Sequence, residues 1–173
     1  AEALALDVAA RRVGGDVAVQ VTVANQETGH HVPTGSPLRH VLLLVEATGT
    51  DGELLALRAG PRLPAWCGVG DAADGCYGGL PGVVFAKVLE DLWTGTSPTA
   101  AYWNPTRVLL DNRIAAGAED VSRYRFEVSD DGPVHVEARL LFRRAFLELA
   151  AKKGWTDPDI EMGRRSIVVA AGE

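Results

Sequence analysis

Hydrophobic and polar positions alternate strictly in two stretches near the start of the chain. The stretch 16–25 alternates small or polar residues with four valines, which are Val17, Val19, Val21 and Val23. Because successive side chains of a strand point to opposite faces, this period predicts a strand whose valines face the core. The stretch 4–8 alternates in the same way, and the glycines at 14 and 15 lie between the two stretches. We therefore predict that they form a hairpin.

The next stretch, 40–48, is apolar on both faces through Val41–Val45, which is typical of a central strand. The turn residues Thr50, Asp51 and Gly52 are then expected to reverse the chain into a strand at 54–58. A further strand is predicted at 107–110.

A second hairpin is predicted near the end of the chain. The stretches 124–128 and 134–140 alternate apolar and charged residues, and the strong turn sequence 129–133 lies between them. The segment 144–153 has helix-forming residues and ends in two lysines and Gly154, which indicates a short helix. Residues 166–171 supply a last strand.

The middle of the chain, 59–104, holds most of the prolines and glycines with little sustained period. It also holds Trp66, Trp93 and Trp103, and tryptophan is rare in flexible linkers. We interpret it as an ordered, elaborated loop region. Within it, the stretch 84–92 fits a short helix or an edge strand equally well.

These elements predict a mostly β fold over a single domain, 1–173. The fold class is an immunoglobulin-like or fibronectin-like β-sandwich with a long elaborated middle loop region and one short C-terminal helix.

Charge and composition argue against nucleic acid as a partner and against insertion into a membrane. The 173 residues carry a net charge of −6 without a cluster of lysine and arginine large enough to bind nucleic acid. The longest apolar run, Val41–Val45, is too short for membrane insertion, because a bilayer needs about 20 residues. The start Ala1-Glu2-Ala3 resembles the end left either by cleavage of an export signal or by excision from a longer chain. The first alternative favours a periplasmic or extracellular location.

Two cysteines, Cys67 and Cys76, lie in a glycine-rich stretch. Their spacing fits a disulfide that closes a small loop in an oxidising compartment. The alternative is a pair of free buried thiols.

Several chemistries lack their sequence signatures. No Cys-x-x-Cys-His is present, so the chain attaches no c-type haem of its own. A blue-copper arrangement around Cys76 is improbable, because His135 and Met162 are far away in the sequence. The common hydrolase, nucleotide and calcium motifs are also missing.

Three of the four histidines, His30, His31 and His40, lie in or next to the connection 25–40. Imidazole is a common metal ligand, and three histidines within 11 positions converge if residues 36–39 fold back. A second hypothesis is that these histidines serve in acid–base catalysis. A third hypothesis is purely structural: one histidine hydrogen-bonds the loop backbone and the others are exposed.

The segment Val23–Gly35, with its Gly-His-His-Val-Pro-Thr-Gly and Arg39 shortly after, resembles a known pattern. It is similar to the N-x-x-x-G-H-x-x-P-T-G signature of β-sandwich domains attached to, or encoded beside, bacterial periplasmic multihaem c-type cytochromes. Weaker similarities continue at 81–89, 102–104 and 111–126. The resemblance implies export, a redox setting and a haem-bearing neighbour, which is either a partner chain or a missing domain.

Three functional hypotheses follow. The first is a non-catalytic periplasmic accessory domain for electron transfer, which docks on a multihaem cytochrome or another redox protein and offers His30 or His31 to haem c. The second is a small copper or other metal-binding protein that uses His30, His31 and His40. The third is an enzyme with a pocket in the tryptophan-rich middle region and Asp111 or Glu90 as its acid–base group.

Overall fold

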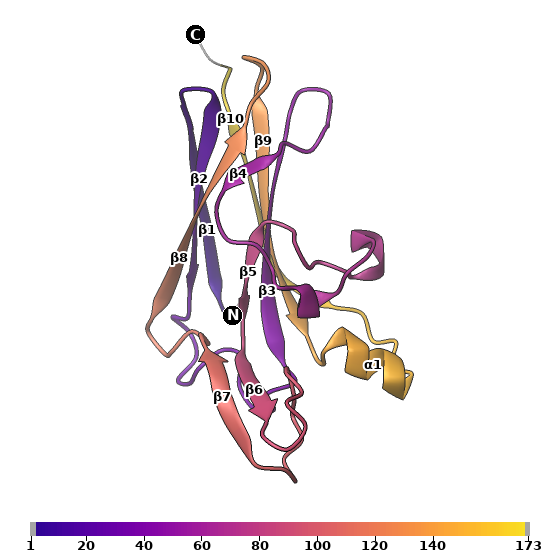
Figure 1. Ribbon diagram of the computed structural model, residues 1–173. Helices are drawn as coiled ribbons and strands as arrows, with labels where there is room; N and C mark the ends of the chain where they lie inside the picture. Colours follow the sequence, from indigo (N-terminus) through magenta and orange to yellow (C-terminus); the bar gives the residue numbers. More distant parts are fainter. Residues whose placement is uncertain (1–2, 172–173) are drawn as a thin grey trace.

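Two four-stranded antiparallel sheets pack face to face in the computed structural model, which describes residues 3–171 (Figure 1). The first sheet has the order β1 (Ala5–Val13), β2 (Asp16–Ala24), β8 (Glu119–Glu127) and β4 (Leu57–Ala59). The second has the order β10 (Ile160–Val169), β9 (Val134–Arg143), β3 (His40–Thr48) and β5 (Gly82–Phe85). The predicted β-sandwich is confirmed. The residues Ala1 and Glu2, on which the expected processed start rests, lie outside the described part.

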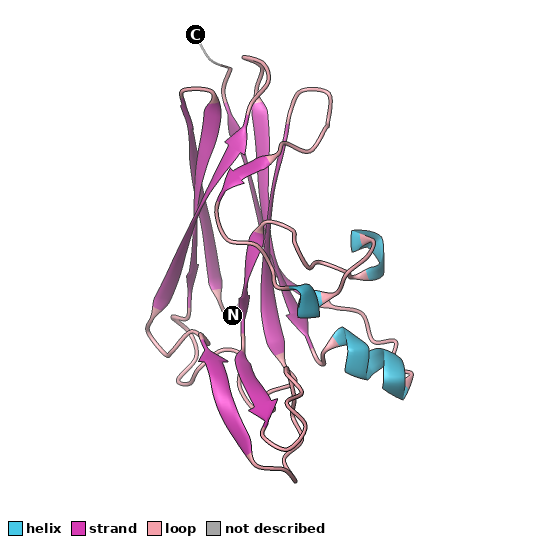
Figure 2. Cartoon of the chain, in the orientation of Figure 1, coloured by secondary structure: helices cyan, strands magenta, loops and turns pink. Residues whose placement is uncertain are grey.

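Helices are few and short (Figure 2). The only α-helix of the described part is α1 (Leu147–Lys153), accompanied by the short 3₁₀ helices η1 (Ala65–Cys67) and η2 (Ala72–Asp74). The predicted C-terminal helix is thus confirmed, and it ends as expected at Gly154, which has a φ of 66°. No helix within residues 3–171 is long and apolar enough to cross a membrane.

The core between the sheets contains the alternating valines of β2. Val17, Val19, Val21 and Val23 are at most 2% exposed, as predicted. A second, smaller apolar cluster lies on the outer side of β3, where Leu42 and Leu44 pack with Leu63 and Cys67 of the middle region. Because the middle region covers this side, β3 is apolar on both faces.

The second predicted hairpin is wrong. The strands β8 and β9 belong to different sheets, and the turn 129–133 carries the chain from one sheet to the other. Arg12 of β1 holds this crossing, since its guanidinium donates hydrogen bonds to the carbonyls of Asp130 and Gly132. Two strands joined by a turn show the same alternation and the same turn residues whether they pair in one sheet or lie in two different sheets. The local pattern therefore could not identify the partner strand.

The stretch 84–92 forms strand rather than helix. It contributes to β5 and to β6 (Lys87–Asp91), which pairs with β7 (Thr106–Asp111) in a separate two-stranded sheet. We call residues 87–111 the arm. In Figure 1 the arm projects beyond the large sheets at the end where the chain passes from β2 to β3.

Candidate functional site

The connection between β2 and β3, residues 25–39, is called the histidine loop below. Its shape depends on Asn25, which is fully buried and whose Nδ2 donates hydrogen bonds to the carbonyls of His30 (2.7 Å) and Ile114 (3.0 Å). The hydroxyl of Thr28 lies 2.5 Å from Asn25 Oδ1 and 3.0 Å from the carbonyl of His30. Buried polar groups that are paired in this way hold a loop in one conformation.

The middle of the histidine loop is anchored to the connection between β7 and β8, which follows the arm. Val32 is buried, and it exchanges backbone hydrogen bonds of 2.9 and 3.0 Å with Ile114. The peptide bond between Val32 and Pro33 is cis. Two residues before Ile114, the side chain of Asn112 bonds Ala86 N (3.0 Å) and the carbonyl of Val84 (2.8 Å), which fixes the base of the arm to β5. The histidine loop and the arm are therefore fastened at the same end of the sandwich.

Both adjacent histidines are exposed. His30 Nδ1 lies 3.0 Å from the carbonyl of His31. Because a carbonyl only accepts hydrogen bonds, Nδ1 carries the proton in this contact and the lone pair of His30 Nε2 is free. The imidazole of His31 makes no hydrogen bond within the described residues.

His40, in contrast, is fully buried at the start of β3. Its ring stacks on Phe146 at 5.4 Å and meets Trp66 edge-on at 5.3 Å. Burial lowers the pKa of His40 to about 4, and Nδ1 donates to the carbonyl of Leu38 at 3.0 Å. Its Nε2 is buried without a partner in the described structure.

The structure does not bring His30, His31 and His40 together as the predicted metal site requires. Within residues 3–171 no group of three or more histidine, cysteine or carboxylate side chains could hold a metal ion. The reason is that His40 belongs to β3 and turns into an aromatic cluster, whereas the other two histidines stay in solvent. Closeness in sequence did not bring the three imidazoles together.

The structure does not contain the predicted disulfide, and Cys67 and Cys76 are both free thiols in it. Cys67 packs in the apolar cluster outside β3, and burial raises its pKa to about 12. The loop between them is closed by backbone hydrogen bonds instead, from Tyr77 N to the carbonyl of Cys67 (3.3 Å) and from Gly78 N to that of Gly68 (2.7 Å).

Arg143 is a buried residue that the sequence analysis missed. Its guanidinium bonds both carboxylate oxygens of Asp159 at 2.8 and 2.6 Å. It also bonds the carbonyls of Cys67 (2.9 Å) and Gly75 (2.7 Å) and lies 5.1 Å from the ring centre of Tyr77. A single side chain thus joins β9, the cysteine loop and the segment after α1. Its only sequence signal is an arginine that follows an apolar run.

The residues of the enzyme hypothesis lie in the arm. Both carboxylate oxygens of Asp111 accept bonds of 2.7 Å from Arg113, which holds the pKa of Asp111 below its usual value. Glu90 is ion-paired with Arg107. The structure thus engages both carboxylates with arginines. No tryptophan of the middle region lines the hollow on the first sheet or the one beside α1.

The arm instead exposes a large apolar surface. Trp93, Tyr102 and Trp103 are 72%, 91% and 68% exposed, and four aliphatic residues are exposed with them: Leu92, Val108, Leu109 and Leu110. The tip is nevertheless held together by buried Asp91, which accepts bonds from Trp93 N (2.8 Å) and from the side chain of Asn104 (2.5 Å). Exposed apolar side chains on a well-held element are typical of an interaction surface.

Comparison with solved structures finds a likeness in fold. No protein-family model matches the chain, and no curated protein matches it either. Among solved structures it is similar to a penta-haem cytochrome c552 from Thermochromatium tepidum, with a TM-score of 0.69 and 18% sequence identity. The match covers 96% of this chain and 40% of that chain. The likeness therefore shows that this β-sandwich fold also occurs as less than half of a penta-haem cytochrome.

Proposed function

We propose that the chain is a non-catalytic periplasmic accessory domain of an electron-transfer system, which docks on a multihaem cytochrome. The observation that carries the proposal is the fold likeness to part of a penta-haem cytochrome. The chain has no Cys-x-x-Cys-His for attaching haem c. The haem is therefore carried by a partner chain or by another domain.

In the histidine loop, His30 would be the residue that holds the iron of such a haem. His30 is exposed, and its Nδ1–H bonds the carbonyl of His31, which leaves Nε2 as the free nitrogen. A backbone acceptor for the other ring nitrogen orients a ligating imidazole and makes it more basic. We therefore assign the ligand role to His30 and an orienting role to the backbone of His31.

The arm supplies the docking surface in this proposal. It carries the exposed aromatic side chains Trp93, Tyr102 and Trp103 at the same end as the histidine loop. Aromatic residues are the side chains most enriched at the centres of protein interfaces. When bound, the haem of the partner supplies one-electron chemistry, and the chain's own residues position it and exclude water.

Docking is tested with a tagged chain purified gently from its native host. We expect co-purified haem c in a fixed ratio, detected by its Soret band. Trp93→Ser combined with Trp103→Ser should reduce that ratio at least about tenfold, because central aromatic contacts dominate interface energies. Val168→Ser is the matched control, since Val168 is 60% exposed on β10. A haem-free preparation would contradict docking, and equal haem ratios in all three proteins would contradict docking through the arm.

Ligation is tested separately with a haem c peptide that has one open axial position. Wild-type protein should convert the ferric haem from high spin to low spin, and His30→Ala should abolish the conversion. His135→Ala is the control, because His135 is also exposed but lies on β9. If the His135 variant loses the signal and the His30 variant keeps it, the ligand assignment is wrong.

A further inference from the structure

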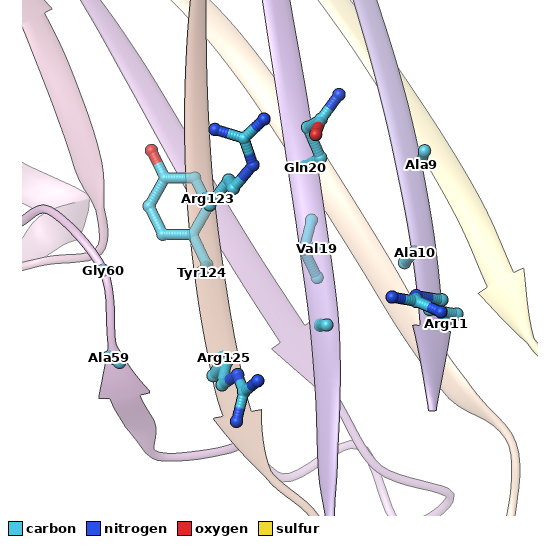
Figure 3. Close-up of a pocket in the computed structure, with 11 residues that line it drawn as sticks. Ala9, Ala10, Arg11, Val19, Gln20, Ala59, Gly60, Arg123, Tyr124 and Arg125 are labelled. Carbon is cyan, nitrogen blue, oxygen red and sulfur yellow. The ribbon is translucent and has the colours of Figure 1, made fainter. Parts of the chain in front are cut away.

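A hollow of about 520 Å³ lies on the outer face of the first sheet (Figure 3), and no residue of the histidine loop lines it. The strand register shows how it is built. Arg11 of β1, Ala18 of β2 and Arg125 of β8 follow one another in one row across the sheet. In the neighbouring row Ala9, Gln20 and Arg123 do the same. Outward side chains of one row are neighbours, so three arginines surround a floor of small residues.

The floor and one wall of the hollow depend on the absence of large side chains. Ala9, Ala18 and Ala59 line the floor, so only a methyl group rises between Arg11 and Arg125, and the longer side chain of Gln20 stands beside Arg123. The wall at β4 is backbone, because a Cβ at Gly60 would lie only 2.9 Å from the carbonyl oxygen of Arg123. We call this hollow the arginine groove.

The arginine groove is positive in a chain whose net charge is −6. Its lining contains three arginines and no carboxylate. Of the acidic residues at its border, Asp16 and Glu127 pair with Arg58 at 3.3 and 2.7 Å, and Asp16 lies 3.9 Å from Arg125. Asp7 is the next outward residue of β1 beyond Ala9. Within the described residues, Arg11 and Arg123 have no ion-pair partner.

We propose that the arginine groove binds an extended acidic segment of a protein partner. Charge complementarity selects acidic groups, since guanidinium groups pair with carboxylates in a planar, bidentate geometry. Spacing selects a segment over a single small anion. Arg123 and Arg125 are two residues apart on β8, which is about 6.7 Å and equals the spacing of alternate side chains in an extended peptide.

The third arginine, Arg11, extends the row of positive charges across the sheet. Arg11 lies two strands from Arg125, which corresponds to about 10 Å between their Cα atoms. A single small anion contacts one or two of the three guanidinium groups, whereas a run of carboxylates reaches all of them. The alanine floor leaves room for the peptide backbone between the arginines.

The probe for this proposal is fluorescein-labelled hexaglutamate, measured by fluorescence anisotropy. The wild-type protein should bind it, and binding should weaken steeply as NaCl rises from about 50 to 300 mM, because salt screens exposed charges. Arg123→Gln should weaken binding about fivefold, and Arg123→Gln with Arg125→Gln more than tenfold. Ala18→Glu should abolish binding, since it places a carboxylate between Arg11 and Arg125.

Arg165→Gln is the matched control, because Arg165 is an exposed strand arginine of the second sheet. It should leave binding within about twofold of wild type, and circular dichroism checks that all variants are folded. The proposal is overturned if wild type does not bind at 150 mM NaCl or if Arg165→Gln loses as much as Arg123→Gln. It is also overturned if tripolyphosphate displaces the probe at a lower concentration than unlabelled hexaglutamate does, which would indicate a phosphate-bearing ligand. His30→Ala should bind hexaglutamate normally, so this result and the haem result are independent.

Discussion

His30 and His40 stand ten positions apart and have the same local contact, yet their environments are opposite. In each, Nδ1 lies 3.0 Å from a nearby backbone carbonyl, which fixes the same tautomer. His30 is exposed and its free Nε2 is open to a ligand, whereas Nε2 of His40 is sealed among Phe146 and Trp66. The comparison teaches that access, and not tautomer, separates a ligand candidate from a structural histidine.

The largest expected effect is a loss of stability when a buried polar side chain, Arg143, is removed. Arg143→Ala leaves Asp159 and two loop carbonyls without their donor, so the free energy of unfolding should fall by about 3–5 kcal/mol. Urea unfolding measures it. The neighbouring Arg144 is the control, since its pair with Asp157 is exposed and Arg144→Ala should cost at most about 1 kcal/mol. Equal losses in the two variants would show that burial does not distinguish these arginines.

The next effect is a pH dependence that only the buried histidine should produce. The pKa of His40 is lowered from 6.5 to about 4, so the unfolded chain binds its proton more readily than the folded chain. The contribution of neutral His40 to the free energy of unfolding is fully present above about pH 6.5. It is lost as the pH falls, and the loss reaches about 3 kcal/mol at pH 4.

Urea unfolding at pH 7 and pH 4 tests this, with His40→Phe as the variant that cannot titrate. The loss between the two pH values should be about 3 kcal/mol smaller in His40→Phe than in wild type. The double variant His30→Gln, His31→Gln should keep the wild-type loss. If the exposed pair changes the pH dependence and His40 does not, the assignment of the two environments is reversed.

The two cysteines also differ in burial, and replacing them should have a smaller effect on the free energy of unfolding. Cys67→Ser should lower the free energy of unfolding by about 1–2 kcal/mol, because it buries a hydroxyl in an apolar cluster. Cys76→Ser should cost less than about 0.5 kcal/mol. Titration of the unfolded protein without reductant should find two thiols. No free thiols, together with equal losses in the two variants, would mean that a disulfide forms after all.

The smallest expected effect is on the exposed histidines themselves. His30→Ala and His31→Ala should each change the free energy of unfolding by less than about 0.5 kcal/mol, as is usual for exposed side chains. Thermal melting at pH 7 measures this. A loss above about 1 kcal/mol in His30→Ala would mean that its contact with the carbonyl of His31 serves the fold.

The sequence predicted those parts of the fold that local patterns determine. The facing of Val17–Val23, the first hairpin and the helix end at Gly154 depend on neighbours along the chain, and all three were predicted correctly. The partners of β8 and β9 depend on distant strands, so their pattern suggested a false hairpin.

The candidate site divides in the same way. The Gly29–Gly35 segment could be singled out from its residues, because two histidines, a proline and two glycines are an unusual choice for a strand connection. The burial of His40 and the anchoring role of Arg143 depend on α1 and on the cysteine loop, which pack from far away in the sequence. The arginine groove also needed the strand register, since its arginines come from β1 and β8.

Asn25 has a consequence for the thermodynamics of partner binding. Its single buried amide group bonds the carbonyls of both His30 and Ile114, so the loop of the ligand candidate and the segment that leaves the arm share one anchor. The free protein has already ordered these two segments relative to each other, and little conformational entropy remains to be lost when a partner binds both. Affinity for such a partner then depends on the contacts made at the surface, and dissociation requires releasing both segments together.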